Sequence, residues 1–117
     1  MMVFMSPDED PGVHNPRVID LVAHDPELDE FGLIMVETRP WDGSTQRLLE
    51  LQAKINAYLS FALDGEMYRL YPESVGKQLR LELDTYSPPD DTALTFIAQV
   101  RDKLVNDRIA FVVRILD

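Results

Sequence analysis

The C-terminal third of the chain places the strictest limit on the fold. Residues 77–86 (KQLRLELDTY) alternate between apolar and polar side chains, which is typical of a β-strand. The turn-forming residues SPPDD follow, then a helical pattern over residues 90–106, and then a second strand-like run at 108–116. Because the connections around this helix are so short, the two strands must be parallel and joined by a right-handed crossover.

Two more strands and a longer helix precede this unit. Residues 17–24 and 31–39 are rich in Val, Ile and Leu and flank the acidic, proline-containing segment DPELDE, as in an antiparallel β-hairpin. A helix is predicted over residues 44–64, with Asp42 or Ser44 as its N-cap. It ends at Asp64-Gly65, where glycine can adopt the left-handed conformation. Ser87 with Pro88, or Asp90, is the expected start of the second helix.

The order β-β-α-β-α-β predicts an α+β fold, a two-layer sandwich of a mixed four-stranded sheet with two helices on one face. The strands at 31–39 and 108–116 are apolar on both faces, which is typical of central strands, whereas 77–86 suits an edge or a half-solvated position. Residues 17–117 are expected to form a single domain with one hydrophobic core. Residues 1–16 contain three prolines and a run of acids, which predicts a flexible N-terminal arm.

Charge and composition exclude several classes of function. Twenty-one acidic residues against eleven basic ones give a net charge of −10, which opposes binding to nucleic acid because phosphate contacts require clustered Lys and Arg. Such acidity more often serves solubility than function, and the alternative is an acidic face that binds a basic protein partner. No apolar run approaches the ~20 residues of a membrane helix. With no signal peptide and no cysteine, we expect a cytoplasmic protein that does not bind membranes.

The sequence contains no recognisable catalytic motif. His24 and Asp25 are neighbours on a predicted strand, so their side chains point to opposite faces and are not coupled. The serines lie outside any nucleophile elbow, and the glycines form no phosphate-binding run. No spacing of His, Asp or Glu matches a metal site. We therefore predict no catalytic residue, cofactor or metal, and lean against an enzyme.

One weak candidate pocket involves Trp41, Asp42, Tyr68 and Tyr71. The first two precede the long helix, and the tyrosines lie on one side of a short turn after it. Together they would offer aromatic walls and one polar group to a small ligand. The alternative, which we favour, is that Asp42 caps the helix, Trp41 covers its first turn and the tyrosines seal the edge of the core.

The long helix is apolar on more sides than one core requires. At about 100° per residue, one broad stripe faces the sheet; it comprises Leu48, Leu51, Ile55, Tyr58, Leu59 and Ala62. A second stripe comprises Leu49, Ala53, Ala57 and Phe61. No polar groups converge on it, so it suits a protein contact rather than a ligand. Its cover is the second helix, the N-terminal arm or the same helix of a second chain, and we predict a homodimer with these four residues in the interface.

Several segments resemble a family of small uncharacterised bacterial proteins, a domain of unknown function. They are VIDLVAHD (18–25), Trp41-Asp42, LLELQAKINAYLSFAL (48–63), GEMYRLYPES and KQLRLEL. The resemblance spans residues 15–117 and implies a stand-alone α+β domain without an assigned activity. Our leading hypothesis is a small acidic, non-catalytic protein-interaction module that forms a homodimer, and an acidic binder of a basic protein is one subclass of it. The alternative is a small-molecule-binding protein or small enzyme with a pocket near Trp41, Asp42, Tyr68 and Tyr71.

Overall fold

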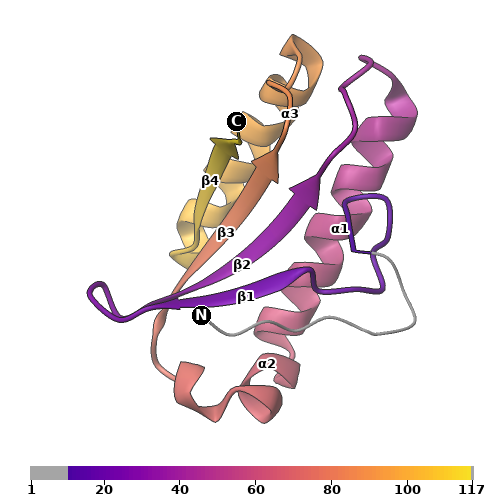
Figure 1. Ribbon diagram of the computed structural model, residues 1–117. Coiled ribbons are helices and arrows are strands. Elements are labelled where there is room, and N and C mark those ends of the chain that lie inside the picture. Colours follow the sequence, from indigo (N-terminus) through magenta and orange to yellow (C-terminus); the bar gives the residue numbers. More distant parts are fainter. Residues whose placement is uncertain (1–10, 117) are drawn as a thin grey trace.

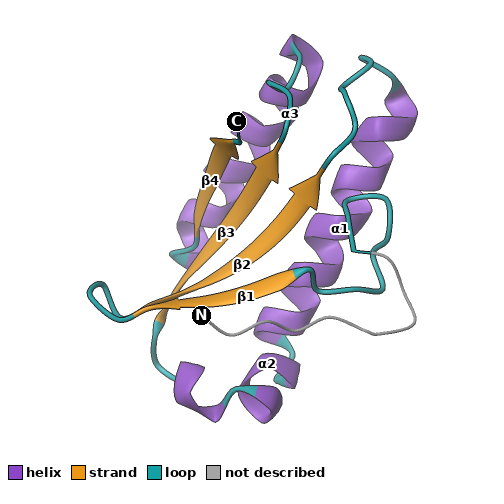
Figure 2. Ribbon diagram, in the orientation of Figure 1, coloured by secondary structure: helices purple, strands orange, loops and turns teal. Residues whose placement is uncertain are grey.

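The computed structural model describes residues 11–116 and confirms the mixed α+β architecture (Figures 1 and 2). The elements follow in the order β1 (Leu21–Asp25), β2 (Glu30–Glu37), α1 (Thr45–Leu63), α2 (Glu66–Leu70), β3 (Gln78–Thr85), α3 (Asp91–Leu104) and β4 (Ala110–Ile115), with single 3₁₀ turns at Pro72–Ser74 and Val105–Asp107. The sheet order is β1-β2-β3-β4. Strands β1 and β2 are antiparallel, whereas β2, β3 and β4 run parallel.

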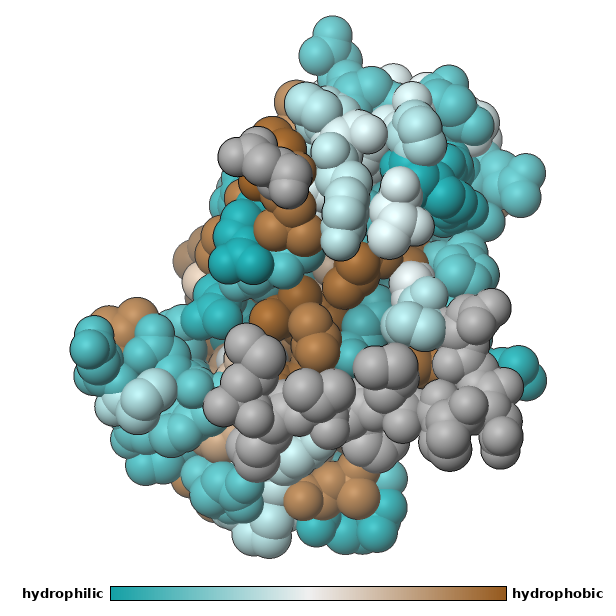
Figure 3. All heavy atoms as spheres, in the orientation of Figure 1, coloured by the Kyte–Doolittle hydropathy of each residue, from teal (hydrophilic) through white to brown (hydrophobic). Residues whose placement is uncertain are grey.

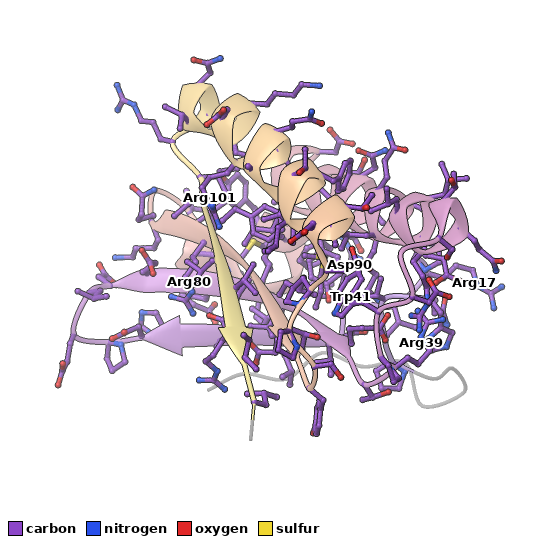
Figure 4. All side chains as sticks on the ribbon, turned by 90° about the horizontal axis from the view of Figure 1, so that it is seen from above. Arg17, Arg39, Trp41, Arg80, Asp90 and Arg101 are labelled. Carbon is purple, nitrogen blue, oxygen red and sulfur yellow. The ribbon has the colours of Figure 1, made fainter. Side chains whose placement is uncertain are left out.

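Both long helices lie on one face of the sheet, which Figure 4 shows as two layers. The β2–α1–β3 and β3–α3–β4 crossovers move across the sheet in the same direction, and right-handed crossovers then place both helices on the same side. Every second residue of β2 and β3 points into this layer and is buried in the core: Phe31, Leu33 and Met35 on β2, and Leu79, Leu81 and Leu83 on β3. In the described part of the chain no helix lies on the opposite side, which we call the open face.

The positions of two strands differ from the prediction. Strand β2 is central as expected, but β3 is also central and β4 is an edge strand. The alternation of β3 therefore reflects the two sides of the sheet: Arg80, Glu82 and Asp84 all point to the open face. The apolar character of β4 does not mean that it is covered, since Val112 and Ile115 are 38% and 50% exposed.

The helix ends follow local rules that the sequence shows. Ser44 caps α1, with its side chain accepting a hydrogen bond from the backbone N–H of Arg47. Asp90 caps α3 by accepting from the N–H of Ala93. Gly65 follows α1 with φ of 97°, the left-handed conformation expected for a glycine at this position. The turn after Gly65 is the separate short helix α2.

The packed part of the domain begins before residue 17. Residues 1–10 of the predicted arm lie outside the described residues. Val13, which also belongs to that predicted arm, is only 1% exposed and lies in the core. Its N–H donates to the carbonyl of Val36, 3.0 Å away, so this segment is attached to the end of β2.

Candidate functional site

A buried lysine connects the N-terminal segment to α1. Lys54 has no exposed surface, and its ammonium group donates to the carbonyls of Asn15 (2.6 Å) and Val18 (2.7 Å) and to Oδ1 of Asp20 (2.9 Å). Burial lowers the pKa of Lys54, and the carboxylate of Asp20 acts in the opposite direction. All three N–H groups of the ammonium are therefore used.

Asp20 and Tyr58 extend this network to the sheet. The Asp20 carboxylate also accepts from the N–H groups of Gly12 and Val36, each at 2.9 Å. The Tyr58 hydroxyl accepts from the N–H of Asp20 and donates to the carbonyl of Ile34, both at 2.7 Å. Burial is the main cause of a raised Tyr58 pKa. Because each of these polar groups already has a partner, the network joins three parts of the fold and leaves none for a substrate.

A second buried cluster lies where β2 leads into α1. The Glu37 side chain is 2% exposed and is held by both Nε and Nη2 of Arg39. Arg47 from α1 binds the same carboxylate at 2.7 Å. The pKa of Arg39 is raised, chiefly by its hydrogen bonds to Glu37. Beside this cluster, Nε1 of Trp41 donates to the hydroxyl of Thr85 at 3.0 Å.

The structure does not bring the four residues of the candidate pocket together. Trp41 and Asp42 precede α1, whereas Tyr68 and Tyr71 follow it, and this helix of 19 residues is about 28 Å long. Tyr68 lines a separate cavity of about 280 Å³ with Lys77 and Arg108. Asp42 accepts from the N–H of Ser44, which is itself the N-cap of α1, and Trp41 bonds to Thr85 on β3. The expected cap at Asp42 and the expected cover of the first helical turn by Trp41 therefore differ from the contacts that these residues make.

The second stripe of α1 is not one continuous surface. Leu49 is 59% exposed and Ala53 is also exposed, but Ala57 is half-buried and Phe61 is only 8% exposed within a single chain. Phe61 and Ala57 instead line a cleft of about 680 Å³, with walls from residues 16–19 and from the segment around α2. Phe61 belongs to the core of its own chain, so Leu49 and Ala53 are the exposed part of the interface predicted on this stripe.

The open face carries a pair of carboxyl groups that sequence reasoning missed. Glu82 and Asp84 are two residues apart on β3, so their side chains share one face, and they are 7% and 4% exposed. Nε of Arg80 is 3.0 Å from Glu82, and its other end binds Glu30 on β2. Arg114 on β4 lies 3.4 Å from Oδ2 of Asp84.

A glycine on β2 makes room for this arrangement. Gly32 is the partner of Arg80 in the β2–β3 register, and a Cβ at position 32 would collide with the guanidinium group. Without that Cβ, the Arg80 side chain crosses β2 and reaches Glu30. Gly32 therefore allows the open face to hold an ordered row of charges.

Asp84 has the most unusual environment of these groups. Burial, followed by a hydrogen bond to Glu82 and the charge of that carboxylate, raises the pKa of Asp84 to about 7, against the opposing effects of Arg114 and Arg80. Oδ1 of Asp84 is buried and has no hydrogen-bond partner among the residues that the structure describes. Such an unpaired oxygen is rare in folded proteins and marks this position as a candidate contact point.

Two negative findings hold for residues 11–116. No helix there is long and apolar enough to cross a membrane. No group of three or more His, Asp or Glu side chains in the same range is arranged to hold a metal ion.

Comparisons with known proteins add a family but no activity. The model of a family of unknown function (DUF6572) matches residues 12–117, which confirms the resemblance to an uncharacterised domain. No curated protein and no solved structure matches the chain. The match begins at residue 12, close to where the described packing of the N-terminal segment begins.

Proposed function

The chain belongs to this family of unknown function, and we propose that it is a non-catalytic protein-interaction module that binds a basic partner through the open face. The face has the composition of an interface, with apolar side chains beside charged ones. Its apolar residues are Leu21, Ala23, Ile34, Val36 and Val112, and its charged ones include Arg80, Glu82, Asp84 and Arg114. Figure 3 shows hydrophobic side chains in the middle of this side of the molecule and hydrophilic ones around them.

The single observation that carries the proposal is the oxygen of Asp84 that has no hydrogen-bond partner among the described residues. A buried acceptor without a donor costs about 1–3 kcal/mol, and this cost is recovered if the side chains around Asp84 move apart on binding and a partner supplies the donor. The net charge of −10 favours a cationic donor, although Glu82 and Glu30 are already paired with Arg80 on this face. A Lys or Arg side chain of a basic protein has the matching charge, and the planar guanidinium of Arg can also bind a carboxylate through two hydrogen bonds.

The other polar clusters support a role without catalysis. Lys54, Tyr58 and Glu37 are residue types that enzymes use, but here they are buried and their hydrogen-bonding groups are bound to the protein itself. A general acid or base must reach the substrate directly or through one water molecule. These side chains therefore serve the stability of the domain.

Affinity capture from the native host, with mass spectrometry, tests the proposal. The baits are the wild-type protein, Asp84→Leu, which removes the acceptor from the open face, and Leu94→Glu on α3 as a control on the helix side. Circular dichroism first establishes that all three are folded. We expect one basic protein to be retained by the wild type and Leu94→Glu and to be lost with Asp84→Leu. Equal recovery by all three baits would contradict a role for the open face.

A thermal-shift screen of metabolites and metal ions separates this proposal from the small-molecule alternative. A ligand at 100 times its dissociation constant adds about 2.7 kcal/mol to the stability of the folded state. We expect no compound to raise the melting temperature, because the proposed partner is a protein. A clear shift that is unchanged in Asp84→Leu would favour a ligand site elsewhere, such as the cleft beside Phe61.

A further inference from the structure

We infer that β4 pairs with β4 of a second copy, antiparallel across a two-fold axis, so that the two four-stranded sheets form one continuous sheet. The inference rests on the proposed interaction function and deepens it by naming a second copy of the chain as one partner. The second copy would bind at the free edge of β4, whereas the basic partner would bind at the open face.

The backbone of β4 offers hydrogen-bonding groups along this edge. The N–H of Leu116 donates to the carbonyl of Thr85, so even-numbered residues of the strand direct their backbone groups toward β3. Odd-numbered residues direct theirs outward, and the carbonyl of Phe111 accordingly accepts from Nε of Arg101 at 3.0 Å. Figure 4 shows Arg101 beside this strand. Within residues 11–116, the outward N–H and C=O groups of Val113 and Ile115 have no partner.

The side chains of β4 do not protect the edge. Edge strands of monomeric proteins usually carry several charges, a proline or a bulge, which prevent pairing with another sheet. The strand AFVVRI has one charged residue, Arg114, and no proline. Its apolar residues Val112 and Ile115 are 38% and 50% exposed. The composition of this edge is therefore typical of a strand that pairs with a strand of another chain.

Charge explains why a second copy fits here. Two molecules with a net charge of −10 repel each other, and this repulsion is weakest where the local charge is not negative. Residues 101–116, which include β4 and the end of α3, carry four basic and two acidic side chains. The opposite edge of the sheet is β1, which carries one acidic side chain, Asp25, and no Lys or Arg, and residues 26–30 after it carry three more acids. The β4 edge is thus the better of the two for self-association.

The pairing register follows from the faces of the strand. A two-fold axis perpendicular to the sheet keeps helix face with helix face, so opposed residues must point to the same side. Placing Val113 opposite Val113 pairs the outward backbone groups and puts Phe111 opposite Ile115, which buries Ile115. The carbonyl of Phe111 has two lone pairs and can keep Arg101 while accepting a second N–H. A register centred on Arg114 is disfavoured because it would oppose like charges.

Light scattering after size-exclusion chromatography tests the inference on the full chain. We expect the wild type to have twice the chain mass of 13.4 kDa. Ile115→Lys places a charge at the edge, and Val113→Pro removes an outward N–H without touching the β3 ladder; both should be folded monomers of 13.4 kDa. Val105→Lys is the matched control, because Val105 is 66% exposed outside the strand, and it should remain a dimer.

Two outcomes would overturn the inference: a wild type that is monomeric at high micromolar concentration, or dimers that persist in both edge variants. In the second case Leu49→Lys tests whether α1 forms the interface instead. If monomeric Ile115→Lys still captures the basic partner, the open face acts without the dimer. If the wild type is a dimer but captures no basic protein, the β4 contact stands and the proposed function is refuted.

Discussion

Replacing Asp84 with asparagine should remove a pH dependence from the stability of the domain. In the folded protein the pKa of Asp84 is raised from 3.8 to about 7, so the folded state binds its proton more tightly than the unfolded chain. The contribution of this proton to stability is present at low pH and is lost as the pH rises from about 4 to about 7. Asp84→Asn keeps the shape of the protonated acid, and its amide can donate to Glu82 as that acid does.

The size of the effect follows from the shift in pKa. One unit corresponds to 1.36 kcal/mol, so a shift of roughly three units has an upper bound on the order of 4 kcal/mol. Arg114 is 64% exposed and free to move toward a charged Asp84, which reduces the loss at high pH. We expect Asp84→Asn to match the wild type near pH 4 and to exceed its free energy of unfolding by about 2 kcal/mol at pH 8.

Urea denaturation of both proteins at several values between pH 4 and pH 8 measures this difference. Asp102→Asn is the matched control, because it removes one carboxylate from an exposed position on α3. A carboxyl carbon NMR titration of the wild type reports the pKa of Asp84 directly. The reasoning is refuted if the two stability curves run parallel, or if Asp84 titrates below pH 5.

Three further outcomes are expected. Lys54→Met should cost about 3–5 kcal/mol, because it leaves the buried Asp20 carboxylate without its charged partner; chemical denaturation followed by circular dichroism measures this loss. Trp41→Phe should cost about 0.5–1.5 kcal/mol through the lost hydrogen bond to Thr85, with no change in oligomeric mass. Fluorescence anisotropy should detect no binding of DNA or RNA at physiological salt, and micromolar affinity would reveal a basic surface hidden by the net charge.

The sequence was sufficient where structure depends on near neighbours. The caps at Ser44 and Asp90 and the glycine after α1 are local signals, and a helix with short connections leaves only one handedness for the crossover between β3 and β4. The length of α1 alone could also have separated Trp41 from Tyr68. The order of the strands was harder, since the same alternation in β3 suits an edge strand or a central strand with one open face.

The buried charges could not be derived, because their partners are distant along the chain. Lys54 lies three residues after Leu51 and four before Tyr58. This spacing places it on the buried side of α1, so the sequence does indicate a buried lysine. Its acceptors at Asn15, Val18 and Asp20 lie more than 30 residues away and come together only in the folded state. The pair of Glu82 and Asp84 likewise depends on the strands at either side.

The enclosure of Lys54 has a chemical consequence. The chain has three lysines, and Lys77 and Lys103 are exposed while Lys54 is not. An amine-acylating reagent needs an accessible, uncharged amine, so it should modify the two exposed lysines in the native protein and reach Lys54 only when residues 12–20 separate from α1. The extent of acylation of Lys54 therefore measures how often that contact opens, and peptide mass spectrometry determines it without a mutation.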